Sequence, residues 1–161
     1  SLSDLEERIS TYTNHCSQKL RKQNSSCNSI LVFISSSTHK KTIQYRNSFI
    51  IPLPYATNSS IILNKFAFKA LHRIYRKNIE YKKAGVILMD LVNSNEKQLN
   101  LFNKNINNHN NLMITIDRLN KRFGNHNLKL ASQDLSETWK MYQENLSKKY
   151  TTKLSEIITV R

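Results

Sequence analysis

The chain has 161 residues, of which 25 are Lys or Arg and 11 are Asp or Glu, so its formal net charge at pH 7 is +14. This length corresponds to one domain, or to one domain with a small appendage. With 39% apolar residues and 14 aromatic side chains, the chain can form a modest core, which excludes a wholly disordered protein. No apolar run approaches the roughly 18 residues of a membrane-spanning helix, so we expect no membrane span.

Basic residues are concentrated in the first part of the chain. Residues 9–95 carry 13 basic and two acidic side chains, a net charge of +11, whereas residues 96–161 have a net charge of +5. Such an excess predicts a polyanionic partner, with nucleic acid as the first candidate and an anionic membrane surface as the second. The alternative is a solvated surface in a chain that is simply rich in Asn and Lys.

The first predicted element is an amphipathic helix. Ser3 and Glu6 have the spacing of a capping box, so we expect the helix to begin there. The apolar positions recur every three or four residues and predict one buried stripe. That stripe consists of Leu5, Ile9, Tyr12, Cys16 and Leu20.

Two extended segments follow and predict a β-hairpin. Residues 27–36 are a short β-branched and apolar run, and residues 44–53 alternate between two faces. A basic bend at residues 37–42 joins them. Because proline cannot donate to a strand ladder, we expect Pro52 and Pro54 to end the second strand.

A second helix and a third strand complete this part of the chain. Asn58, Ser59 and Ser60 are candidate caps for a helix that extends to Ile74, and residues 81–91 predict a strand. The order predicts an α+β fold, a small mostly antiparallel sheet with two helices on one face. Because one edge of the sheet would be uncovered, we expect the first strand of the domain to be missing upstream.

Asparagine dominates the next segment. We assign residues 1–92 to the first domain, residues 93–111 to an Asn-rich linker and residues 112–161 to a short helical C-terminal extension. Within the extension, Leu112, Ile116, Leu119 and Phe123 predict one amphipathic helix that ends at Gly124. Leu135, Trp139, Tyr142 and Leu146 repeat the same spacing.

The sequence carries no recognisable catalytic or metal site. Its acidic residues are scattered, without the converging carboxylates that hold Mg²⁺ in phosphoryl transfer, and it has only two glycines for a phosphate-binding loop. Cys16 and Cys27 lack the spacing of a zinc site or a disulfide framework, and the acidic residues 1–6 do not resemble a secretory signal. We expect a non-enzymatic chain with free thiols, no cofactor and a cytoplasmic location.

One apolar cluster interrupts the linker. The cluster lies among asparagines and consists of Gln98, Leu99, Leu101 and Phe102. Each of its three large apolar side chains would lose roughly 1.5 to 3 kcal/mol of burial free energy if it stayed exposed to water. The cluster resembles the pentapeptide with which bacterial polymerases dock on the sliding clamp. The alternative is a chance apolar cluster that packs back on the domain.

From about Leu20 onward the chain resembles the C-terminal region of the UmuC family, the Y-family translesion DNA polymerases. The resemblance rests on segments that occur in family order. Among them are residues 45–48 (YRNS), 53–57 (LPYAT), 70–75 (ALHRIY), 81–90 (YKKAGVILMD), 98–102 (QLNLF) and 146–152 (LSKKYTT).

The resemblance implies that the first domain is the little finger domain, which grips primer-template duplex beside the polymerase active site. The Mg²⁺ and its carboxylates would then lie in catalytic domains absent from this chain, and the protein would be nucleoid-associated. We expect strand ends and the bend to contact phosphates without reading bases. The residues expected to do so are Lys40, Lys41, Arg46, Ser48, Lys82 and Lys83.

A second interpretation assigns the chain to protein interactions and treats its charge as incidental. The family's association with UmuD′ and RecA suggests Trp139 and Tyr142 as partner-binding anchors. The alternatives for this region are a simple two-helix packing unit and a tail that is helical only when bound. An RNA-binding role fits the charge but not the pentapeptide.

Overall fold

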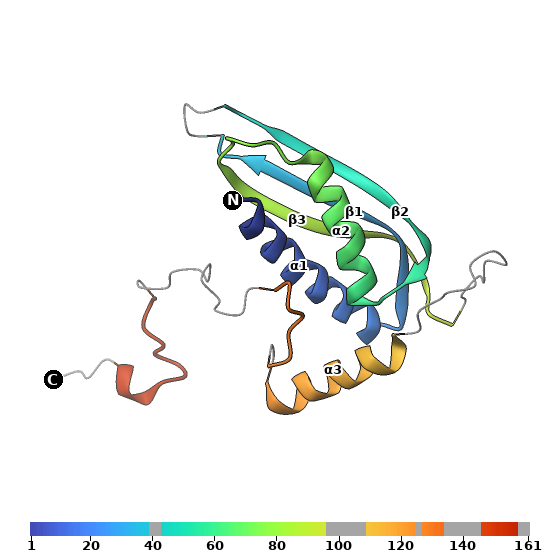
Figure 1. The fold of residues 1–161 in the computed structure, drawn as a ribbon. Helices are drawn as coiled ribbons and strands as arrows, with labels where there is room; N and C mark the ends of the chain where they lie inside the picture. The colour runs from blue at the N-terminus through green and yellow to red at the C-terminus, as the bar shows by residue number, and fades with distance from the viewer. Residues whose placement is uncertain (39–42, 96–108, 125–126, 134–145, 158–161) are drawn as a thin grey trace.

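A computed structural model describes residues 1–38, 43–95, 109–124, 127–133 and 146–157. Three strands form an antiparallel sheet in the order β2-β1-β3, and helices α1 and α2 cover the same face of it (Figure 1). This architecture confirms the predicted α+β class. The elements in chain order are α1 (Leu2–Lys22), β1 (Ser25–Ser36), β2 (Arg46–Thr57), α2 (Ser60–Ile74), β3 (Tyr81–Asn93), α3 (Asn110–Phe123) and the 3₁₀ turn η1 (Leu154–Glu156).

Helix α1 begins earlier than predicted. The capping box is formed by Ser1 and Asp4, because the Asp4 amide donates to Ser1 Oγ at 3.3 Å and Asp4 Oδ2 accepts from the Ser1 amino group at 2.7 Å. The prediction of Ser3 and Glu6 was therefore wrong. Glu6 lies one turn into the helix and pairs with His72 of α2 instead.

The buried stripe of α1 is more polar than predicted. Leu5, Ile9 and Leu20 are buried as expected, but Thr13 and Ser17 take the places predicted for Tyr12 and Cys16, which lie on the half-exposed flank. Small hydroxyl residues at this position let α1 and α2 approach closely. Ser17 Oγ lies 2.6 Å from Ser60 Oγ, and Asn64 Nδ2 donates to Ser10 Oγ at 3.2 Å.

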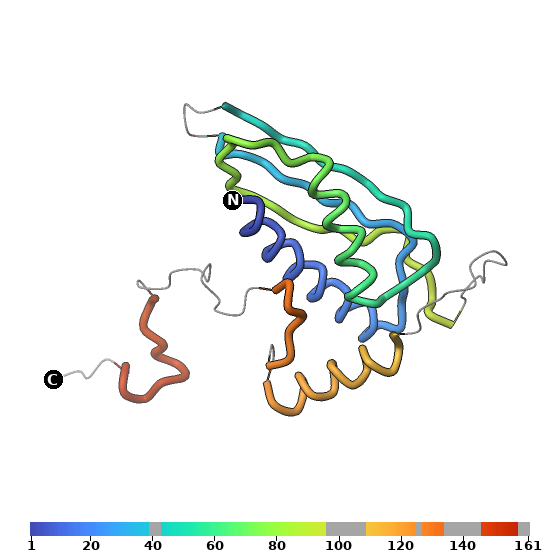
Figure 2. The backbone as a smooth tube through the Cα atoms, in the orientation of Figure 1, coloured from blue at the N-terminus to red at the C-terminus, as the bar shows by residue number. Residues whose placement is uncertain are grey.

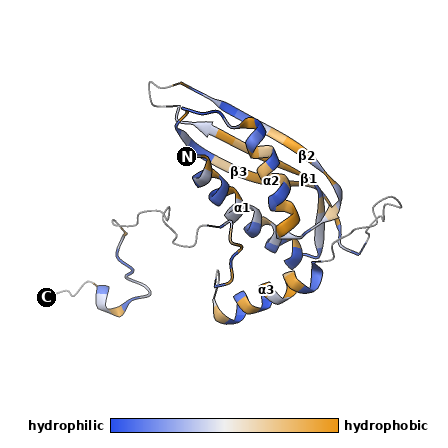
Figure 3. Cartoon of the chain, in the orientation of Figure 1, coloured by the Kyte–Doolittle hydropathy of each residue, from blue (hydrophilic) through white to orange (hydrophobic). Residues whose placement is uncertain are grey.

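The apolar core lies between the sheet and the two helices. Ile30, Val32 and Ile34 of β1 are fully buried against Leu63 and Leu71 of α2. Each such side chain stabilises the fold by about 1.5 to 3 kcal/mol through burial. In Figure 3, hydrophobic colour follows the strands and alternates with hydrophilic colour along the helices. Cys16 and Cys27 are free thiols, and burial raises the pKa of Cys27 to about 12.

Strand β2 does not end at the prolines. Pro52 lies opposite Ser29 within the strand, and β2 continues past Pro54 to Thr57 through a bulge, where residues 53–56 have no partner in β1. The prediction of a strand end was wrong because β2 lies at an edge of the sheet. There a proline can point its nitrogen away from the ladder without losing a hydrogen bond.

Helix α3 packs beside the C-terminal end of α1 instead of on the sheet, as the chain path in Figure 2 shows. Its termination at Gly124, which has φ 106°, agrees with the prediction, whereas its start at Asn110 lies two residues before the predicted extension. The side that docks differs from the predicted stripe. Met113 is 1% exposed, whereas Leu112 and Phe123 remain 48% and 62% exposed.

An ion pair between Arg21 and Asp117 fastens α3 to α1. Arg21 Nε and Nη2 donate to the two carboxylate oxygens at 2.6 and 2.8 Å, and the arginine side chain is 8% exposed. Arg21 Nη1 also donates to the Asn58 carbonyl at 2.8 Å. Arg21 therefore holds α1, α3 and the connection before α2 together.

Further polar contacts extend this junction on both sides. Ser59 Oγ lies 3.0 Å from His109 Nδ1, and Ser10 Oγ lies 2.7 Å from Ser132 Oγ. Asn120 Nδ2 donates to the Leu128 carbonyl at 3.1 Å, which folds residues 127–133 back along α3. No described helix is both long and apolar enough to cross a membrane.

We predict that Asp117→Asn releases α3. The change leaves the buried Arg21 guanidinium without its carboxylate, which costs about 2 kcal/mol for a pair that is partly open to water. Amide hydrogen exchange in residues 113–123 then accelerates, while exchange in β1 stays unchanged. Arg118→Gln is the control, because Arg118 is exposed. Equal protection of α3 in both variants would contradict this account.

Candidate nucleic-acid interface

The strand register brings two basic residues to one end of the outer sheet face. Ser35 of β1 lies opposite Arg46 of β2 on one side and opposite Lys83 of β3 on the other. Directly paired residues point to the same side of a sheet. Arg46 and Lys83 therefore flank Ser35 on the face that α1 and α2 leave open.

A β-bulge adds a third cation. Ser35 pairs with Lys83 and Ser36 pairs with Tyr81, so Lys82 is an extra residue without a partner in β1. A bulge of this kind redirects side chains locally. As a result Lys82 and Lys83, although adjacent in the chain, line the same cavity.

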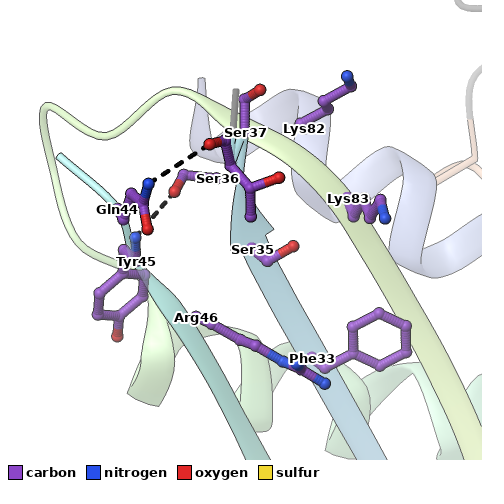
Figure 4. Close-up of a pocket in the computed structure, with 10 residues that line it drawn as sticks. Phe33, Ser35, Ser36, Ser37, Gln44, Tyr45, Arg46, Lys82 and Lys83 are labelled. Atoms are coloured by element: carbon purple, nitrogen blue, oxygen red, sulfur yellow. Dashed lines mark hydrogen bonds between the residues drawn. The ribbon is translucent and has the colours of Figure 1, made fainter. Parts of the chain in front are cut away.

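This cavity, which we call the sheet-end cavity, has a volume of about 630 Å³ and opens to solvent (Figure 4). Its walls combine the three cations with hydroxyl, amide and aromatic groups. The lining residues are Phe33, Ser35, Ser36, Ser37, Thr38, Gln44, Tyr45, Arg46, Lys82 and Lys83.

Hydrogen bonds fix the two strand ends that frame the cavity. The Ser36 amide donates to the Tyr45 carbonyl at 2.8 Å, and the Tyr45 amide donates to Ser36 Oγ at 2.8 Å. Gln44 Nε2 donates to the Thr38 carbonyl at 3.4 Å. These contacts hold the entry and exit of the bend, so the neighbouring polar groups keep a set geometry.

The three cations of the cavity form no ion pair among the described residues. Arg46, Lys82 and Lys83 are all exposed, and none forms an ion pair with a carboxylate in the described ranges. Asp90 accepts a hydrogen bond from Ser29 farther along the sheet. A cluster of like charges without counter-charges produces a local positive potential that attracts anions.

Tyr81 connects the cavity to the end of α2. Its hydroxyl donates to the Arg76 carbonyl at 3.1 Å and accepts from the Arg76 amide at 2.8 Å, and its ring packs edge-on against Tyr45 at 6.2 Å between centroids. Burial raises the pKa of Tyr81, so the phenol keeps its proton and remains a hydrogen-bond donor.

The structure places some of the predicted phosphate-contact residues together and leaves others outside the described ranges. Arg46, Lys82 and Lys83 come together, and Ser48 lies on the same outer face opposite Phe33 but outside the cavity. Lys40 and Lys41 lie outside the described residues, as do the clamp-motif residues Gln98, Leu99, Leu101 and Phe102 and the anchors Trp139 and Tyr142.

Sequence reasoning missed the neutral lining of the cavity. Ser35 and Gln44 carry no charge that would single them out, and their role appears only once β1 and β2 are paired. The alternation of the strands was the available signal, because it places Ser35 on the same face as Phe33.

Gly85 lets the Phe33 ring lie across β3. A Cβ atom at position 85 would lie 2.4 Å from Phe33 Cζ, and Phe33 forms part of the cavity wall. A larger residue at position 85 would therefore require the Phe33 ring to move.

We predict that Gly85→Ala displaces Phe33 and destabilises the fold by about 1 kcal/mol, the low end for overpacking. Urea unfolding measures the change. In a Phe33→Leu background the same substitution becomes neutral or stabilising, because the clash is gone. An equal cost in both backgrounds would show that Phe33 is not the cause.

Two known protein-domain families match this sequence. The description "impB/mucB/samB family C-terminal domain" matches residues 1–101, and a domain of unknown function, DUF4113, matches residues 110–160. The chain belongs to the impB/mucB/samB family. The match confirms the resemblance found in the sequence and covers the whole sheet.

The relatives in this family align along nearly the full chain. Protein UmuC of Salmonella typhimurium is 32% identical over 161 residues, which are 98% of this chain and 38% of the relative. Protein MucB of Escherichia coli is 34% identical over 155 residues, 94% of this chain and 36% of the relative. Protein ImpB of Salmonella typhimurium is 31% identical over 160 residues, 98% of this chain and 38% of the relative. The chain spans less than two fifths of the length of these relatives.

Proposed function

We propose that this chain is the non-catalytic C-terminal part of a translesion DNA polymerase. In this role it grips primer-template duplex through the phosphate backbone and tethers the polymerase to the sliding clamp. The observation that best supports this proposal is the sheet-end cavity. Arg46, Lys82 and Lys83 line it, and none of them forms an ion pair with a carboxylate among the described residues. Membership of the impB/mucB/samB family supports the assignment.

The cavity suits a phosphate group chemically. Arg46 can donate two parallel hydrogen bonds to phosphate oxygens, and the two lysines act as point charges. The Ser35 hydroxyl and the Gln44 amide add neutral donors beside them. Binding releases the counterions condensed on DNA, which supplies affinity without reading bases. Tolerance of base identity is what a polymerase needs to copy damaged templates.

The polymerase chemistry itself is assigned to the rest of the parent protein. Two metal ions held by converging carboxylates would carry out the phosphoryl transfer there. Lys40 and Lys41, which follow β1 in the sequence and lie outside the described residues, are proposed as additional phosphate contacts.

We predict that Lys82→Ala with Lys83→Ala weakens binding to primer-template duplex about tenfold or more at low salt, because two phosphate contacts are lost. The slope of log affinity against log salt falls by about 2. Fluorescence anisotropy with a labelled duplex measures both quantities.

The matched control is Lys148→Ala with Lys149→Ala, a second adjacent and exposed lysine pair. It carries the same loss of charge and keeps nearly full affinity if the cavity is the binding site. Equal losses in the two variants would reduce the interaction to net charge and contradict the proposal.

The tethering half of the proposal rests on Gln98, Leu99, Leu101 and Phe102. The glutamine amide supplies a directional hydrogen bond, and the apolar side chains fill a preformed pocket on the clamp. Joining a modest DNA binder to a ring already on DNA makes the second encounter intramolecular, which raises the overall affinity.

We predict that Leu101→Ala with Phe102→Ala abolishes clamp binding and leaves duplex affinity unchanged, as surface plasmon resonance on immobilised clamp will measure. Leu112→Ala with Phe123→Ala is the control, because it removes an exposed Leu and Phe from α3. A chain that still binds the clamp after the first change would overturn the tethering assignment.

A second candidate function is a protein-interaction module for UmuD′ or RecA. It is favoured by the apolar side chains that α3 leaves exposed, Leu112 and Phe123, and by the proposed anchors Trp139 and Tyr142. Under this function the control variant above loses partner binding, and the Lys82 and Lys83 variant keeps it.

A further inference from the structure

A second set of cations lies on α2, away from the sheet-end cavity. Lys65, Lys69 and Arg73 are exposed on successive turns, and Arg76 follows directly after the helix. At 1.5 Å per residue, the row from the first to the last spans about 17 Å. Residues 8–79 of the sequence contain no Asp or Glu, so α2 carries no acidic side chain of its own.

One described ion pair reaches α2. Glu6 of α1 pairs with His72, which leaves the four cations outside that contact. No described ion pair involves Lys65, Lys69 or Arg73. The α2 surface therefore keeps its positive charge within the described part of the protein.

Aromatic rings hold three of these cations in place. The Arg73 guanidinium lies 4.6 Å from the Phe49 ring, the Arg76 guanidinium lies 4.8 Å from the Tyr45 ring, and Lys69 Nζ lies 5.1 Å from the Phe66 ring. A guanidinium stacked on a ring keeps its N–H donors free at the edge. Less side-chain entropy is then lost when it binds an anion.

Tyr45 joins this row to the sheet-end cavity. Its ring lies beneath Arg76 and also lines the cavity, and its hydroxyl donates to the Ile74 carbonyl at 2.6 Å at the end of α2. The Tyr81 hydroxyl fixes Arg76 from the other side. The positive surface thus continues from the cavity, around the β2 edge, to α2.

We infer that Lys65, Lys69, Arg73 and Arg76 form a second nucleic-acid backbone site, the α2 track, which continues the sheet-end cavity around the β2 edge. The inference rests on the proposed function, since it extends the same ligand along the molecule. Nucleic acid is favoured over an acidic protein because the track is a row of evenly spaced cations that joins a cavity suited to phosphate. A polyphosphate backbone can occupy both without a break.

The experiment compares three variants of the full chain on the same labelled 24-base-pair primer-template duplex over a range of salt concentrations. The first variant is Lys65→Gln with Lys69→Gln, which changes exposed side chains only and preserves the arginine stacks. The second is Lys82→Gln with Lys83→Gln. The third, Lys148→Gln with Lys149→Gln, matches their loss of charge in the C-terminal tail. Circular dichroism checks that each variant is folded.

The α2 track predicts that the first variant lowers the salt slope by about 2 and weakens binding about tenfold at low salt. Its effect adds to that of the second variant, because the two sites contact different phosphates. The third variant changes the slope by less than 1.

Other outcomes of this experiment distinguish failure of the α2 track from failure of the sheet-end cavity. If the first variant matches the third, the α2 track is overturned, and an acidic protein becomes the better partner for α2. If the first variant loses affinity and the second does not, the track stands and the sheet-end cavity of the proposed function fails. If the wild-type chain does not bind the duplex, both assignments fail.

Discussion

The pairing of β1 with both of its neighbours is the constraint on which the structure depends. This central strand buries Ile30, Val32 and Ile34 against the helices on one face, and on the other face it sets Ser35 between Arg46 and Lys83. Because side chains alternate along a strand, a slip of one residue would turn the core outward and the cations inward. Burial of the core therefore fixes the position of the charges.

Repulsion among the clustered cations of the sheet end and α2 destabilises the folded protein. Clustered cations repel each other, and the Lys and Arg residues at the sheet end and along α2 keep this repulsion, because none of them forms an ion pair among the described residues. Arg21 shows the other solution within the same chain. Its charge is buried and neutralised by Asp117, and it serves to fasten α3. Arg21 is buried and paired, which fits a structural role, whereas the exposed cations without an ion pair fit the proposed binding role.

The sequence predicted the fold class, the hairpin, the second helix and the third strand, because each has a clear apolar period and polar ends. Its errors came from tertiary context. The prolines of β2 continue the strand because they lie on an edge, and Thr13 and Ser17 are buried because α2 approaches them closely. The pairing of Arg21 with Asp117 could not be predicted, since the two residues are 96 positions apart in the sequence.

For the candidate site, the sequence identified charges but not their neighbours. Lys82, Lys83 and Arg46 were named because they are polar or basic residues near the ends of predicted strands. The bulge that aligns the two lysines and the space that Gly85 gives to Phe33 depend on strand register. The stacking of Arg73 on Phe49 depends on the packing of α2 against β2. Such features follow from contacts between residues far apart in sequence, so local patterns could not predict them.

The most direct test of the central claim is a titration of the ¹⁵N-labelled chain with a short DNA duplex, followed by amide chemical shifts. The account predicts that the largest shifts at low salt occur at Ser35, Gln44, Arg46, Lys82 and Lys83, and that they vanish together as salt is raised. Shifts confined to α3 and the C-terminal residues, with the sheet end unmoved, would contradict it.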